Sequence, residues 1–216
     1  MSRPSTRNLK LPSPPALERL SQSLATLDAI LLPEPWCDRY YSFDKNWRPA
    51  KGQRMGSMRN GCGDYYFILF GPDGVAIKGF AHEYEMACHG EPPKGVLDAF
   101  PASIEDFLTE PAFSMDDTSF CIWHLPDAEW SIGPVEFPEG DDPDGSEFLL
   151  GLLTGRPEDY QAYARDYFEV DVPLAAIASV YAHAPLTDQT LRALNGEVSL
   201  RDLMDELTEV GYPVAG

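Results

Sequence analysis

The chain has 216 residues and a formal net charge of −19 at pH 7. A chain of this length buries about 70% of the surface that its unfolded form exposes, so it needs neither disulfides nor a metal to hold a core. The first fifteen residues, MSRPSTRNLKLPSPP, lack the apolar segment of a secretory signal, and no later run approaches the ~18 apolar residues of a membrane span, so we expect a cytoplasmic protein.

Charge is distributed very unevenly along the chain. Residues 1–60 contain 10 Lys or Arg and 5 Asp or Glu, a net of +5, whereas residues 61–216 contain 6 and 30, a net of −24. An acidic body repels nucleic acid and anionic lipid, because affinity for nucleic acid comes largely from cations that neutralise phosphates. The charge favours a basic protein partner, or it serves only to keep the protein soluble.

The N-terminal third predicts a flexible segment, one helix and two strands. Prolines at positions 12, 14 and 15 argue against a regular helix at the start, so residues 1–15 are expected to be flexible. Leucines then recur at three- and four-residue spacing, at Leu17, Leu20, Leu24, Leu27 and Leu31. This pattern predicts an amphipathic helix that ends at Pro33 and Pro35, followed by short strands over 39–47 and 53–61.

The segment YYFILFGPDGVAIKGFAHE predicts an antiparallel hairpin. Its first strand is apolar on both sides, since Tyr65, Phe67 and Leu69 point one way and Tyr66, Ile68 and Phe70 the other. We therefore expect a central strand that is covered on both faces. The turn GPDG supplies a proline with a preset φ and a glycine that tolerates positive φ.

The rest of the chain predicts a short helix, two more strands and then helices. The segment SIEDFLTE resembles a helix with Ser103 as its N-cap, and residues 118–125 and 129–137 have the strand pattern. Beyond the acidic loop PEGDDPDGSE, five helical segments are predicted, at 147–155, 157–168, 173–183, 188–195 and 200–211. The simplest architecture is a single α+β domain over 16–216, with an antiparallel or mixed sheet in 38–138 and helices in 145–212.

Histidine and cysteine raise the question of a metal or catalytic site. Four cysteines are scattered without a C-x-x-C pair, at Cys37, Cys62, Cys88 and Cys121, which suggests reduced thiols. The cluster of His82, Glu83, Glu85, Cys88 and His89 resembles H-E-x-x-H, but its histidines are seven residues apart and not four. Cys121 and His124 should point to opposite faces of a strand. We expect the cluster to be a sheet edge, with no metal and no cofactor.

The same stretch also resembles a known family. GCGDYYFILFGPDGVAIKGFAHE, followed by ASIEDFLTE, is similar to the core signature of the SUKH superfamily. The corresponding elements are Gly63-Asp64, the hairpin, His82-Glu83 and the segment from Ser103 to Leu108. The resemblance implies an α+β binding module, typically a bacterial immunity protein that neutralises a toxin, often a nuclease or a nucleic-acid deaminase.

Charge and resemblance together predict a non-enzymatic acidic binding protein. Four carboxylates crowd into one turn, at Glu139, Asp141, Asp142 and Asp144, and are the predicted contact with a basic partner. A merely solvated loop is the simpler interpretation of the same turn. Two other classes stay open, namely a small enzyme that uses Cys62 or His82 beside a glycine-flanked turn, and a regulatory interaction module.

Overall fold

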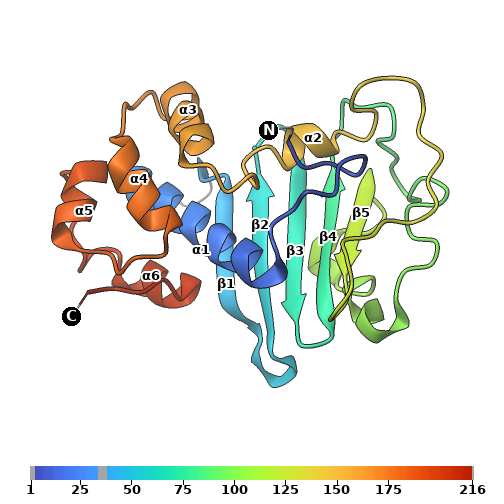
Figure 1. Cartoon of the computed structure of the whole chain (residues 1–216), viewed down its shortest axis with the longest axis horizontal. Helices are drawn as coiled ribbons and strands as arrows, with labels where there is room; N and C mark the ends of the chain where they lie inside the picture. Colours follow the sequence, from blue (N-terminus) through green and yellow to red (C-terminus); the bar gives the residue numbers. More distant parts are fainter. Residues whose placement is uncertain (1–2, 34–37, 216) are drawn as a thin grey trace.

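The structure, a computed structural model, describes residues 3–33 and 38–215 (Figure 1). The sequence-based expectations for Pro35 and Cys37 therefore lie outside the described residues. An N-terminal helix is followed by a five-stranded antiparallel sheet and then by C-terminal helices, which confirms the predicted α+β class with a helical C-terminal part.

The strands are adjacent in space in the order in which they occur in the chain, β1-β2-β3-β4-β5. They are β1 (Tyr41–Arg48), β2 (Gln53–Arg59), β3 (Tyr65–Gly71), β4 (Gly74–Phe80) and β5 (Phe120–His124). The α-helices are α1 (Pro14–Leu31), α2 (Ser146–Leu149), α3 (Pro157–Tyr167), α4 (Leu174–Tyr181), α5 (Asp188–Leu194) and α6 (Met204–Val210). None of these helices is long and apolar enough to cross a membrane.

The sheet separates two hydrophobic cores, and β3 contributes to both. Tyr66, Ile68 and Phe70 join the core that contains α1 and the C-terminal helices. Phe67 and Leu69 face the opposite core. The prediction of a central strand covered on both faces is confirmed, because an apolar residue at every position of a strand can be buried only between two layers.

The second face of the sheet is covered by loops and two 3-10 helices, η3 (Ala102–Phe107) and η4 (Pro111–Phe113). A buried lysine of β4 holds this covering in place. Lys78 donates hydrogen bonds to the carbonyl oxygens of Ser114 and Asp117, and its ammonium lies 4.5 Å from the centre of the Tyr65 ring. Burial lowers the pKa of Lys78 to about 8.

Of two further elements predicted in this region, the helix is present without the predicted cap and the strand is wrong. The helix expected from Ser103 is η3, which starts at Ala102 without a side-chain cap and is interrupted at Ile104, whose φ is −125°. Ile104 is buried in the loop-side core, so its packing takes precedence over helical regularity. The strand expected over 129–137 pairs with β5 only between Ser131 and Trp123. Beyond Ser131 the segment turns and bonds within itself, with the Val135 N–H donating to the Gly133 carbonyl oxygen at 2.8 Å, so it does not continue along β5.

The N-terminal segment, which was expected to be flexible, lies against the sheet domain from residue 3 onward. Thr6 donates from its hydroxyl to the Asp144 carboxylate at 2.6 Å and from its N–H to the Ser146 hydroxyl at 3.0 Å. Leu11 is buried, and the indole of Trp130 donates to the carbonyl oxygen of Pro12 at 3.0 Å. Pro14 and Pro15 are the first residues of α1, where a missing N–H costs no intrahelical hydrogen bond, and the segment before them forms these long-range contacts.

The C-terminal helices follow the predicted order, and α4, α5 and α6 pack against α1. The helix predicted over 147–155 is shorter than expected, because α2 ends at Leu149. The start of α3 at Pro157 is confirmed, since proline at the first helical position loses no intrahelical hydrogen bond. α6 begins only at Met204, later than expected. The Ser199 and Asp202 side chains do bond to one another, at 2.6 Å, but they close a turn and not the first turn of the helix.

Candidate functional site

Two clefts meet at Tyr40 and Tyr41, where β1 begins. The backbone there is held by Asp28 of α1, whose carboxylate accepts hydrogen bonds from the N–H groups of Tyr40 at 3.0 Å and Tyr41 at 2.9 Å. The Tyr160 hydroxyl of α3 donates to the same carboxylate at 2.8 Å. Burial raises the pKa of Asp28 to about 7, although these hydrogen bonds oppose the rise. Asp28 thus joins α1, β1 and α3 at one point.

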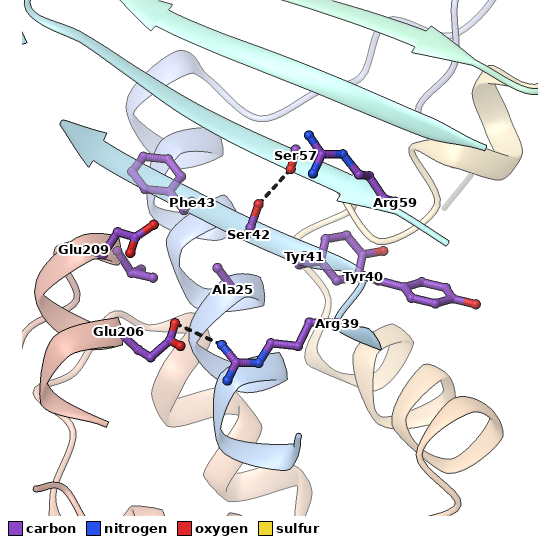
Figure 2. A pocket seen from close by; sticks show the side chains of 11 residues that line it. Ala25, Arg39, Tyr40, Tyr41, Ser42, Phe43, Ser57, Arg59, Glu206 and Glu209 are labelled. Carbon is purple, nitrogen blue, oxygen red and sulfur yellow. Dashed lines mark hydrogen bonds and ion pairs between the residues drawn. The ribbon is translucent and has the colours of Figure 1, made fainter. Parts of the chain in front are cut away.

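The outer cleft, of about 520 Å³, lies between β1 and α6 (Figure 2). Figure 2 shows Arg39 reaching toward Glu206 of α6, and their charged groups lie 2.9 Å apart. Glu209 lines the same cleft, and burial raises the pKa of its carboxyl, helped by the nearby carboxylates of Asp44 and Glu206. The cleft is lined by two cations, Arg39 and Arg59, and by two anions of α6, Glu206 and Glu209, and the Arg39–Glu206 ion pair neutralises one of each.

The inner cleft, of about 410 Å³, lies between the ends of β1 and β2 on one side and α2 and α3 on the other. Its floor is apolar and consists of the buried side chains of Tyr41, Met58 and Leu149. Tyr40 and Tyr163 form a wall, with their ring centres 5.5 Å apart. The remaining side chains at the cleft are mostly polar or exposed, and they are Arg3, Asn60, Phe148, Leu152, Asp159, Ala162 and Asp166.

The hairpin cluster forms a hydrogen-bonded pair between Asp64 and His82. The Asp64 carboxylate lies 2.7 Å from His82 Nδ1 and accepts from the His82 N–H at 2.9 Å, while the Asn60 amide donates to it at 2.6 Å. The hydrogen bond to Asp64 raises the pKa of His82. Burial acts to raise the pKa of Asp64, but the hydrogen bonds from His82 and Asn60 lower it overall. The pair joins the start of β3 to the end of β4, and this structural role is enough to explain its geometry.

The other residues of that cluster do not converge on a metal. His89 pairs with Asp117, 2.7 Å from Nδ1 to Oδ1, and its ring lies against Phe80. Cys62 is exposed and Cys88 half-buried. Across residues 3–33 and 38–215, no group of three or more His, Cys, Asp or Glu side chains is placed to hold a metal ion.

The acidic loop is only partly available to a partner, which corrects the prediction for two of its four carboxylates. Glu139 and Asp141 are exposed. Asp142 accepts hydrogen bonds from the N–H groups of Glu147 at 3.0 Å and Phe148 at 2.9 Å, and so caps α2. Asp144 is 2% exposed and accepts from Thr6 and Ser146. Aspartates that precede a helix commonly cap it, and that signal was present in the sequence.

The loop also meets the hairpin at the same end of the sheet. The Met86 N–H donates to the Pro143 carbonyl oxygen at 3.0 Å. Tyr84 stacks on Phe148 of α2, with ring centres 5.8 Å apart and planes 21° apart. Phe148 is 48% exposed and also lines the inner cleft. We call Tyr84, Phe148 and the exposed carboxylates Glu83, Asp141 and Glu147 the α2 face.

Sequence reasoning missed the aromatic residues of this site. Tyr40, Tyr84, Phe148 and Tyr163 belong to four different segments, and nothing in their spacing indicates that they lie together. Comparisons of the chain with protein-family models, with curated proteins and with solved structures find no match. The SUKH resemblance therefore stays a prediction from the motifs.

Proposed function

We propose that this protein is a non-enzymatic acidic binding protein that neutralises a basic protein partner through the α2 face. The observation that carries the proposal is Phe148, an exposed aromatic residue stacked on Tyr84 and accompanied by exposed carboxylates. Protein interfaces place aromatic anchors at the centre and charges at the rim. Among the exposed large apolar side chains of the described residues, Phe148 has the highest exposed fraction, 48%.

The exposed carboxylates of the α2 face have a different role from the two less exposed carboxylates of the acidic loop. Glu83 is 83% exposed, and Asp141 and Glu147 are exposed as well. Rim charges of this kind act mainly on the rate of association, because they attract a basic partner over about a Debye length. The net charge of −24 in residues 61–216 extends the same field. Asp142 and Asp144 contribute by holding α2 in place.

The SUKH resemblance supports the immunity-protein form of this proposal. Its motif residues Asp64 and His82 lie beside the α2 face, since His82 directly precedes Glu83 in the chain and the Asp64 carboxylate lies 2.7 Å from His82 Nδ1. A toxin that acts on nucleic acid presents a basic surface, which an acidic inhibitor can cover. The partner class that we propose is therefore a nuclease or a nucleic-acid deaminase toxin.

A second candidate function is an enzyme that uses His82 as a general base. A buried carboxylate that orients an imidazole is part of many catalytic sites, and Asp64 orients His82 in this way. Cys62 is exposed on the adjoining loop. The binding proposal ranks first because the Asp64–His82 pair is explained by its role in joining β3 to β4.

The test is copurification with a charge-matched control. The tagged chain is compared in its native host with an α2-face variant, Asp141→Asn, Glu147→Gln and Phe148→Ala. The control carries Glu105→Gln and Glu129→Gln, which remove the same number of charges from exposed carboxylates elsewhere on the surface. We expect a basic protein that the parent and the control retain and the α2-face variant loses, and whose activity the purified parent inhibits.

Retention of the same proteins by the parent and the α2-face variant would contradict the proposal. Loss of a catalytic activity of the chain itself on His82→Ala, with unchanged folding, would favour the enzyme instead.

A further inference from the structure

The inner cleft combines features that suit one kind of side chain. Its floor of Tyr41, Met58 and Leu149 is apolar, and its wall of Tyr40 and Tyr163 presents aromatic surface. A volume of about 410 Å³ is large enough to admit a long side chain. A ligand with an apolar stem and a flat polar end would match both surfaces.

The α3 residues at the cleft add negative charge at regular spacing. Asp159, Ala162, Tyr163 and Asp166 lie at helical spacings of three and four residues, so one face of α3 lines the cleft. The two carboxylates lie on either side of Tyr163 along the helix, and Ala162 leaves space between them. Asp159 is partly occupied, since it accepts from the Thr154 hydroxyl at 2.5 Å.

A guanidinium of this chain already stands at the cleft. Arg3 lines it, and Arg3 Nη1 lies 3.8 Å from the position that a Cβ on Gly151 would take. The Asn8 amide donates to the Arg3 carbonyl oxygen at 2.8 Å, which holds this part of the N-terminal segment. The cleft therefore accommodates an arginine at its rim without help from another molecule.

From this arrangement we infer that the inner cleft binds an arginine side chain presented by the basic partner, and that Arg3 competes with that side chain for the cleft. The inference rests on the proposed function for the identity of the partner. A guanidinium can stack on Tyr40 or Tyr163 while its stem lies on the apolar floor and Asp166 faces its charge. Lysine has the charge but not the flat surface, so arginine is preferred.

The experiment uses small probes and the full chain, and needs no partner. N-acetyl-arginine amide, its lysine and norleucine counterparts and the neutral isostere N-acetyl-citrulline amide are titrated separately while amide resonances are followed by NMR. We expect the arginine probe to shift the resonances of Gly151 and Ala162, and to bind more tightly than the other three. Asp166→Asn should weaken it about two- to fivefold, whereas Glu169→Gln, an exposed carboxylate just beyond α3, should not.

Arg3→Ala is the decisive variant. If Arg3 competes, its removal tightens binding of the arginine probe by a similar factor of about two to five. If binding weakens, Arg3 helps to form the site and does not compete for it, and the inference is overturned. It is also overturned if citrulline or norleucine binds as well as arginine.

The two proposals fail separately. Arginine binding in the cleft without a retained basic protein would remove the proposed function and leave this inference intact. If the parent and Asp166→Asn retain and inhibit the same basic protein equally, the proposed function stays and the inference about the inner cleft is removed.

Discussion

The contribution of Asp28 to the stability of the protein should decrease as the pH rises, which is the opposite of a carboxyl group whose pKa folding lowers. Its carboxyl group is fully buried, and burial raises its pKa from 3.8 to about 7. Because the folded pKa lies above the unfolded one, the folded state keeps a proton that the unfolded state releases as the pH rises. The contribution of Asp28 to the unfolding free energy is therefore fully present below about pH 4 and is lost progressively up to about pH 7.

The size of this effect follows from the shift itself. A difference of about 3 pKa units corresponds to about 4 kcal/mol between the two ends of the pH window. Asp28→Asn removes the titration while keeping the size of the side chain. The unfolding free energy of parent and variant is to be measured by urea denaturation at pH 4, 6 and 8. The stability advantage of the parent over the variant should shrink by up to about 4 kcal/mol across this range.

Taking the difference between parent and variant cancels the other titrating groups, which the two proteins share. Asp166→Asn, at an exposed carboxylate on α3, is measured beside it as the matched control for replacing an aspartate by an asparagine. The reasoning is refuted if the Asp28→Asn difference is constant, since the carboxyl would then titrate alike in the folded and unfolded chains. A parent advantage that grows with pH would refute it as well.

Three further outcomes can be checked by the same denaturation assay. The Tyr163 hydroxyl is buried with no hydrogen-bond partner among the described residues, so Tyr163→Phe should be neutral or stabilising, whereas Tyr160→Phe should lose about 1–3 kcal/mol with its bond to the buried aspartate. Phe67→Ala should cost about 3–5 kcal/mol by leaving a cavity in the loop-side core, and a cost below about 0.5 kcal/mol would mean that the strand is not buried there. Asp144→Ala should destabilise by about 1–3 kcal/mol, because it removes the buried acceptor of the Thr6 and Ser146 hydroxyls and of the Ser146 N–H. Asp141→Ala should change the unfolding free energy by less than about 0.5 kcal/mol, and equal effects would contradict the assigned roles of the two carboxylates.

Local periodicity in the sequence was enough to predict the central hairpin and the order of the helices. The alternation along β3 follows from the two-residue repeat of a strand, and the leucines of α1 follow from the 3.6-residue repeat of a helix. Both patterns depend only on neighbours in the chain. The α+β class could therefore be inferred from these patterns without any knowledge of tertiary contacts.

Tertiary structure decided which polar residues are available and which aromatic residues meet. Asp141 and Asp144 stand in one acidic run, yet one is exposed and the other buried, because Thr6 from the N-terminal segment reaches only the latter. Tyr40 and Phe148 line the same cleft although they are far apart in sequence. Hydrogen bonds and aromatic contacts between distant segments have no period that a sequence can display. The candidate site is built from such contacts, so charge and motifs could predict a binding protein, but they could not predict which side chains the proposed α2 face brings together.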